Sequence, residues 1–167
     1  MATTTKGSAV LTLPSDTEIL VTREFNAPRH LVWKVLTEPD LIKRWWAGRR
    51  GTVTSASVDL RVGGTWRYVM TADGGFEVGF HGEFREIDAP ASMVQTEVYE
   101  GAPDGDSEPT LNHYTLIERD GRTTLTVRTV TSSKELRDLI IDSGMEGGMQ
   151  EGYDLLEELA VELAARP

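Results

Sequence analysis

The sequence has 167 residues, of which 39% are hydrophobic and 26% charged, as is typical of one globular domain with a sizeable core. Its 17 basic and 27 acidic residues give a net charge of −10, which disfavours nucleic acid and anionic membrane surfaces as partners. The sequence contains no cysteine, which excludes disulfides, cysteine-ligated metal centres and cysteine nucleophiles. No apolar run or secretory signal is present, so we expect no membrane insertion and a cytoplasmic location.

The N-terminal part of the chain predicts a tail, a strand and two short helices. Residues 1–16 are rich in Thr and Ser and are expected to form a flexible tail, followed by a single domain over 17–167. Residues 17–26 alternate between apolar and polar side chains, which predicts the first strand. Pro28 and the apolar stripe that follows it predict a helix, and residues 41–46 predict a second helical segment.

Six further strands are predicted in the middle of the chain, joined by short turns that contain glycine or proline. Asp120-Gly121 between two alternating runs is the strongest hairpin signal among them. The predicted strands cover residues 52–60, 65–71, 76–87, 93–99, 111–118 and 123–131.

The C-terminal part predicts one long helix that reaches about Ala165. Ser132 or Ser133 can cap its start, and the glycine cluster around Gly144 should weaken or kink it. Apolar side chains recur along one face of this helix. The solvent side is expected to carry the acidic residues Glu151, Asp154, Glu157, Glu158 and Glu162.

This order of elements predicts an α+β architecture, in which a curved antiparallel sheet wraps around the long C-terminal helix. An amphipathic helix must bury its apolar stripe, and the sheet offers the face that can cover it. A curved sheet closed over a helix can leave a cavity between the two.

Five segments carry a resemblance to a known family. They are REFNAPRHLVWKVL over 23–36, EPDLIKRWW over 38–46, DLRVGGTWR over 59–67, GEFREIDAP over 82–90 and GMEGGMQEGYDLL over 144–156. With these segments the chain resembles the SRPBCC superfamily of START/Bet v-like helix-grip proteins. Within that superfamily it is similar to the activator of heat-shock-protein-90 ATPase homologue-like family, over about residues 17–165.

The resemblance implies the helix-grip fold, and with it a cavity for an apolar or amphipathic small molecule. It does not fix a reaction, because relatives include ligand carriers, cyclases, hydrolases and chaperone-associated domains. The eukaryotic co-chaperone has a separate N-terminal domain that holds much of its chaperone contact. This chain has about 16 residues at that place, so the resemblance does not extend to that domain.

The leading hypothesis is a small helix-grip protein that binds a hydrophobic or aromatic molecule between the sheet and the C-terminal helix. Indole rings and methionines can line such a pocket, and a histidine can anchor a polar group. The alternatives are core packing for the aromatic and methionine side chains, an outer face with cross-strand ion pairs for the strand of His81, and a structural role for His113. The candidate ligand-binding residues are Trp33, Trp45, Trp66, Tyr68, Met70, His81, His113, Met145 and Met149.

Two other classes of function stay open. A cyclase- or hydrolase-type enzyme would use an inward-facing acid or base such as His81 or Glu83. A protein-interaction module would need an exposed apolar patch, with a homodimer or a chaperone contact as its partner. The histidines have no metal-ligand spacing, and neither glycine cluster has the ending of a phosphate loop, so no metal and no cofactor is expected.

Overall fold

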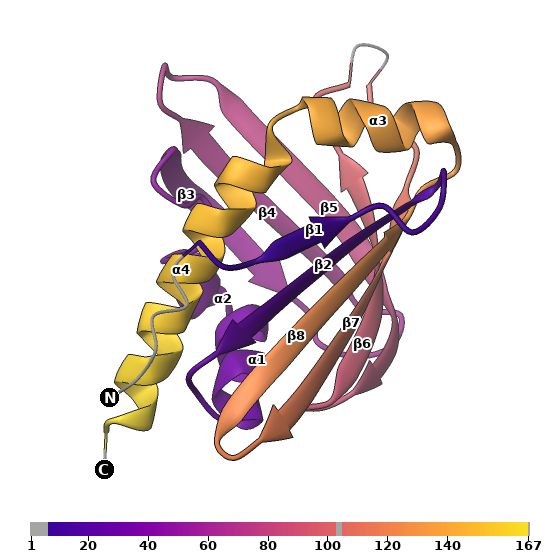
Figure 1. Cartoon of the computed structure of the whole chain (residues 1–167). Coiled ribbons are helices and arrows are strands. Elements are labelled where there is room, and N and C mark those ends of the chain that lie inside the picture. The colour runs from indigo at the N-terminus through magenta and orange to yellow at the C-terminus, as the bar shows by residue number, and fades with distance from the viewer. Residues whose placement is uncertain (1–6, 103–104, 167) are drawn as a thin grey trace.

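The computed structural model describes residues 7–102 and 105–166 and shows a strongly curved antiparallel sheet with helices on its concave side (Figure 1). The helices are α1 (Arg29–Thr37), α2 (Pro39–Ile42), α3 (Lys134–Asp142) and α4 (Met145–Ala164). The strands are β1 (Val10–Thr12), β2 (Glu18–Phe25), β3 (Gly51–Val58), β4 (Thr65–Ala72), β5 (Glu77–Asp88), β6 (Ser92–Tyr99), β7 (Thr110–Arg119) and β8 (Arg122–Val130).

The eight strands form one sheet in the order β1-β2-β8-β7-β6-β5-β4-β3. The seven longer strands are those that the sequence predicts, and the α+β helix-grip architecture is confirmed. The β7–β8 hairpin turns at Asp120 and Gly121, which both have positive φ as the Asp-Gly signal requires. Within the expected tail, Val10–Thr12 pairs with β2 and adds a short edge strand.

The C-terminal helical region is divided at Gly144, where the sequence predicted a weakening of one long helix. Gly144 has a φ of +82°, a left-handed conformation that ends α3 and lets α4 begin in a new direction. The side chain of Ser133 accepts a hydrogen bond from the backbone N–H of Leu136 and caps α3, as predicted. Helix α3 lies across one end of the sheet, and α4 runs along its open side (Figure 1).

A buried ion pair ties α4 to the sheet. The guanidinium of Arg23 on β2 is fully buried and lies 2.9 Å from Asp154 and 3.4 Å from Glu157. The expectation that Asp154 and Glu157 face solvent is therefore wrong, because the helix turns them toward the one arginine on this side of β2. The backbone N–H of Asn26 also donates to Glu157, at 2.9 Å.

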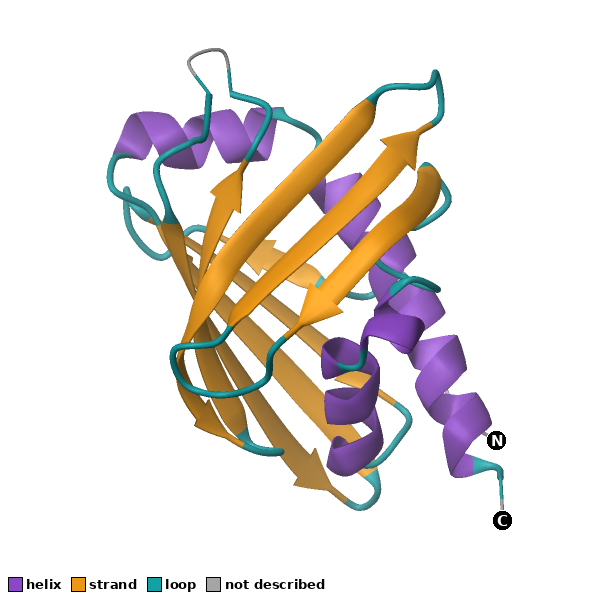
Figure 2. Ribbon diagram, turned by 180° about the vertical axis from the view of Figure 1, so that it is seen from behind, coloured by secondary structure: helices purple, strands orange, loops and turns teal. Residues whose placement is uncertain are grey.

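The two faces of the sheet have different surroundings. We call the face toward α4 the inner face and the opposite one the outer face. The inner face carries the large core side chains, among them Trp66, Phe84, Leu116 and Leu125, which are at least 98% buried. Tyr153 and Leu156 of α4 belong to the same core cluster. Helix α1 packs against α4 and also contacts β7 and β8 (Figure 2).

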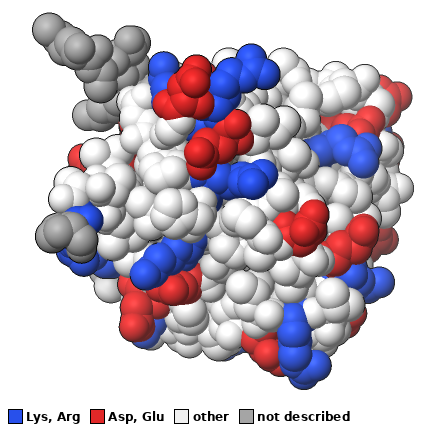
Figure 3. All heavy atoms as spheres, turned by 90° about the horizontal axis from the view of Figure 1, so that it is seen from below, with Lys and Arg blue, Asp and Glu red and all other residues white. Residues whose placement is uncertain are grey.

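The charged side chains on the end of the molecule seen from below are mixed in sign. Basic and acidic groups alternate around that face, and uncharged residues occupy much of it (Figure 3). Such a distribution lacks the continuous basic surface that binds a phosphate backbone.

Candidate functional site

An aromatic cluster lines the inner face where β4 and β5 pass under the segment that follows α2. The rings of Trp66 and Tyr68 are 4.7 Å apart. Trp46 completes the cluster, with its ring 5.4 Å from that of Tyr68 and 5.5 Å from that of Phe80. Both contacts of Trp46 are edge-to-face, an arrangement that aromatic pairs favour. We call Trp46, Trp66, Tyr68 and Phe80 the aromatic cluster.

Gly82 makes the position of Trp66 possible. It pairs with Trp66 across β4 and β5, and the indole Nε1 donates to the carbonyl of Thr96 on β6, at 3.2 Å. A Cβ atom on Gly82 would overlap the Thr96 carbonyl oxygen and lie 2.6 Å from the indole nitrogen. The missing side chain therefore lets the indole cross from β4 toward β6.

Polar side chains occupy the same inner face beside this cluster. Asn112 on β7 donates to the carboxyl of Glu97 on β6 at 3.4 Å, and it accepts from the hydroxyl of Thr129 at 2.7 Å. Gln95, one inward position before Glu97, donates to the Tyr114 hydroxyl at 3.5 Å. We call Gln95, Glu97, Asn112 and Tyr114 the polar cluster.

The electrostatics of the polar cluster follow from its removal from bulk water. Burial raises the pKa of Glu97 above its ordinary value, and the hydrogen bond from Asn112 opposes that rise. Burial also raises the pKa of Tyr68, Tyr114 and Tyr153, and the negative charge of Glu97 adds to each rise. Three phenols from β4, β7 and α4 thus feel the charge of one carboxyl, and all three keep their protons at neutral pH.

Two of these phenols have no hydrogen-bond partner in the described part of the chain. Tyr68 and Tyr153 are each only 8% exposed, and none of the hydrogen bonds of residues 7–102 and 105–166 involves their hydroxyls. Within the same residues, Arg122 Nε is the one enclosed side-chain polar atom without a partner. The two phenol oxygens therefore keep some surface that water can reach, although their side chains are almost wholly buried.

The tryptophans, Tyr68 and Met70 predicted from the sequence lie in different parts of the structure. Trp66, Tyr68 and Met70 alternate along β4 and share its inner face, where the first two belong to the aromatic cluster. Trp33 is buried in α1. Trp45 packs between α1 and α4, because its indole nitrogen donates to the Val35 carbonyl at 2.9 Å and its ring lies 6.2 Å from that of Tyr153.

The two predicted methionines of the C-terminal helix stand near the start of α4. Met149 is partly buried and packs against the hydrophobic core. Met145 is the first residue of the helix and is half-buried. Of the two, Met149 is the one that contributes to the wall opposite the sheet.

His81 and His113 both lie on the outer face. His81 pairs with Arg67 and alternates with Phe80 and Gly82, which face inward. His113 alternates with Asn112 and Tyr114 in the same way, and burial together with Arg128 lowers its pKa. Strand alternation therefore directs both imidazoles away from α4, and the expected polar anchor of the interior is not a histidine.

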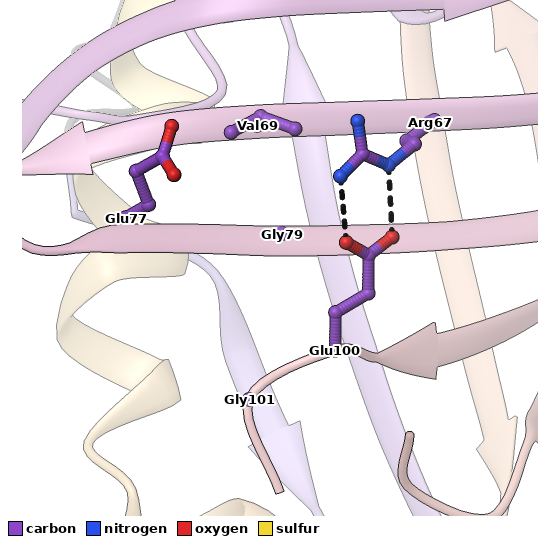
Figure 4. A pocket seen from close by; sticks show the side chains of 6 residues that line it. All are labelled: Arg67, Val69, Glu77, Gly79, Glu100 and Gly101. Carbon is purple, nitrogen blue, oxygen red and sulfur yellow. Dashed lines mark hydrogen bonds and ion pairs between the residues drawn. The ribbon is translucent and has the colours of Figure 1, made fainter. Parts of the chain in front are cut away.

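The outer face has a small pocket of its own, of about 190 Å³. Arg67 faces Glu100 there and makes a two-pronged ion pair, at 3.0 and 2.8 Å (Figure 4). His81 Nδ1 lies 2.7 Å from the same carboxylate. The pKa of Glu100 is lowered to about 2. The hydrogen bond from Arg67 is the main cause, and the contact with His81 is the next group that favours the anion. These contacts are the cross-strand ion pairs of the alternative interpretation, and they already occupy Arg67, His81 and Glu100.

The candidates taken from the sequence do not include several residues of the interior site, namely Trp46, Phe80, Gln95, Glu97, Asn112, Tyr114 and Tyr153. The signal for Glu97 was its position on the same face of β6 as Met93, which is buried on the inner face. The rule that apolar residues face inward points the other way, because Val94, Thr96 and Val98 form the more apolar set on β6.

No group of His, Asp and Glu side chains in the described ranges could hold a metal ion. Likewise, no helix within these ranges combines the length and apolarity that a transmembrane segment needs.

The fold and the interior site define a START-like helix-grip protein. Residues 26–160 match the family described as Activator of Hsp90 ATPase homolog 1-like protein, and the chain belongs to this family. A comparison with curated proteins gives no match.

Solved structures of bacterial proteins share the whole fold. A protein from Rhodobacter sphaeroides is 28% identical, with a TM-score of 0.82 over 95% of this chain and 99% of that one. Protein Ms6760 from Mycobacterium smegmatis is 25% identical, with a TM-score of 0.81 over 93% of this chain and 99% of that one. Protein NE0264 from Nitrosomonas europaea, at 24% identity and a TM-score of 0.80 over 92% of this chain and all of that one, shares the fold.

Proposed function

We propose that this protein binds a small apolar or aromatic molecule in the space between the inner face of the sheet and α4. The observation that carries the proposal is the pair of unpartnered phenols. Tyr68 and Tyr153 are nine-tenths buried, yet neither hydroxyl has a hydrogen-bond partner among residues 7–102 and 105–166. Buried polar groups are normally hydrogen-bonded, so water or a ligand is needed to satisfy these two.

The aromatic cluster supports the same function. Ligand sites are mostly lined by apolar and aromatic side chains, with a few polar groups that fix the orientation of the ligand. Trp46 and Phe80 are partly buried and supply ring surface, and the polar cluster lies on the same inner face. The binding function thus has both of the surfaces that it needs.

A test should fill the space from one side without touching the polar cluster. Ala56 lies on the inner face of β3 opposite Tyr68, and Ser57 is its exposed outward neighbour. With the fluorescent probe N-phenyl-1-naphthylamine, we expect binding by the unaltered protein and a loss of about tenfold or more in Ala56→Phe, because a new ring occupies the space. Ser57→Phe adds the same ring to the outer face and should leave the affinity unchanged.

Two results would contradict the proposal. One is the absence of probe binding by a protein that circular dichroism shows to be folded. The other is equal affinity of Ala56→Phe and the unaltered protein, since the probe would then bind elsewhere.

Glu97 favours a second candidate function, acid catalysis on the bound molecule. Burial raises the pKa of this inward-facing carboxyl, as is common for catalytic acids. The test compares the unaltered protein with Glu97→Gln after each is incubated with a small-molecule cell extract. Catalysis predicts that mass spectrometry finds compounds consumed by the first protein only, and identical extracts would reject it.

A further inference from the structure

The polar cluster and the two free phenols form one end of the interior space, and their chemistry limits what can bind there. Glu97 interacts electrostatically with Tyr68, Tyr114 and Tyr153, which come from three different elements. The Tyr114 hydroxyl already has Gln95 as a partner, and one Glu97 oxygen has Asn112. The hydroxyls of Tyr68 and Tyr153 are thus the groups left for a ligand.

No cationic side chain opposes Glu97. None of the ion pairs in residues 7–102 and 105–166 includes it. Arg23 lies on the same inner face, but Asp154 and Glu157 already neutralise its guanidinium. A ligand that brought a carboxylate or a phosphate to this end would therefore meet a carboxyl group and no compensating positive charge, which is costly in a site removed from water.

The free phenols suit an uncharged oxygen. A phenol hydroxyl can donate one hydrogen bond and can also accept, so Tyr68 and Tyr153 match a carbonyl or a hydroxyl group on a ligand. The rings of Trp46 and Phe80, 5.5 Å apart and only partly buried, provide apolar surface on the same inner face. Removal of the oxygen from such a ligand would leave both phenols unsatisfied again.

From this arrangement we infer that the ligand is an uncharged aromatic or polycyclic molecule with a carbonyl or hydroxyl oxygen, held by the phenols of Tyr68 and Tyr153 beside Glu97. The inference rests on the proposed binding function and adds the chemical class of the ligand. It also excludes fatty-acid anions and organic cations as the preferred ligands of this site.

A series of probes with one common ring system tests the class. The probes are naphthalene, 2-acetylnaphthalene, 2-naphthoate and 2-naphthylmethylammonium, and their dissociation constants are measured at pH 7 by quenching of tryptophan fluorescence. We expect the ketone to bind about tenfold tighter than either charged probe, because only the ketone reaches the phenols without burying an unpaired charge. Naphthalene should bind more weakly than the ketone.

Variants separate the polar end from the apolar wall. Tyr68→Phe and Tyr153→Phe should each weaken binding of the ketone about 2- to 10-fold, the effect of one neutral hydrogen bond, and leave naphthalene binding unchanged. Glu97→Gln keeps an uncharged group of the same shape and should change ketone binding by less than about threefold. Glu100→Gln, on the outer face, is the matched control and should change nothing.

The outcomes distinguish the inference from the function on which it rests. If no probe binds, naphthalene included, the binding function itself fails. If naphthalene and the ketone bind equally and neither Phe variant matters, binding stands and the oxygen-bearing class is wrong. Preference for the ammonium probe, lost in Glu97→Gln, would identify Glu97 as an ionised counter-ion and also overturn the inference.

Discussion

Glu97 and Glu100 are three residues apart at the end of β6, and the sheet places them in opposite environments. Glu97 points inward, where burial raises its pKa, and Asn112 is its hydrogen-bond partner. Glu100 points outward into the ion pairs with Arg67 and His81, which hold its pKa at about 2. The same side chain is thus a hydrogen-bonding acid on one face and a structural anion on the other, because of its neighbours and its distance from water.

The contrast extends to the two faces as a whole. Outer-face charges are paired across strands and remain partly hydrated, whereas inner-face charges and polar groups are largely removed from bulk water. Each face therefore responds to substitution in its own way, and matched pairs of variants can measure the difference.

The largest difference is expected for the arginines. Arg23→Met leaves Asp154 and Glu157 without their buried cation and should lower the free energy of unfolding by about 3–5 kcal/mol. Arg67→Met breaks a more exposed pair and should cost about 1 kcal/mol or less. Urea unfolding of both variants measures this difference, and equal losses would show that the Arg23 pair is not effectively buried.

The glycines of β5 should show a smaller difference of the same kind. Gly82→Ala drives a methyl group into the Thr96 backbone and the Trp66 indole, and should cost about 1–3 kcal/mol or more. The same change at Gly79 meets only the movable end of Glu100, 2.6 Å away, and should cost less than about 1 kcal/mol. Thermal unfolding compares the two, and a stable Gly82→Ala variant would refute the close approach of Trp66 to β6.

Amide replacements of the two glutamates should act in opposite directions at pH 7. Glu97→Gln replaces a carboxyl whose pKa is raised by burial with a neutral amide, and should stabilise the protein by about 0.5–1 kcal/mol. Glu100→Gln removes the anion that Arg67 binds and should destabilise it by about 0.5–1 kcal/mol. Changes of the same sign in urea unfolding would mean that the two carboxyls do not differ as described.

The pH dependence of stability should separate the same pair. The pKa of Glu100 is lowered in the folded protein, so its contribution is complete above its ordinary pKa of 4.5 and is lost as pH falls toward about 2. The pKa of Glu97 is raised, so its contribution is complete below pH 4.5 and is lost as pH rises above that value.

Unfolding free energies measured from pH 3 to pH 8 check both signs. Glu100→Gln should reduce the loss of stability in acid, and Glu97→Gln should reduce the loss at higher pH. A Glu97→Gln profile parallel to that of the unaltered protein across the whole range would show that Glu97 titrates normally.

Local signals were sufficient to predict the fold. Turn residues such as Asp120-Gly121 and the alternation of the strands mark seven of the eight strands, and Gly144 marks the end of a helix. Alternation also separated the side of β5 that carries Phe80 from the side that carries His81. These features depend on a few neighbouring residues, and for that reason they can be read from the sequence.

The interior site depends on what the sheet brings together from distant positions. Glu97 meets Asn112 only because β6 pairs with β7, and Tyr153 faces them only because Arg23 fixes the rotation of α4. The choice between Trp45 and Trp46 depends on the path of the chain after α2 ends at Ile42. Neither apolar periodicity nor residue spacing contains this information.

We propose above all that the protein has an accessible interior space with a polar end. A crystal structure of the protein soaked with 2-acetylnaphthalene tests this most directly. We expect the naphthalene ring against Trp46 and Phe80, with the ketone oxygen within hydrogen-bond distance of the hydroxyl of Tyr68 or Tyr153. An interior filled by side chains alone, with the ketone absent or bound only on the outer face, would contradict it.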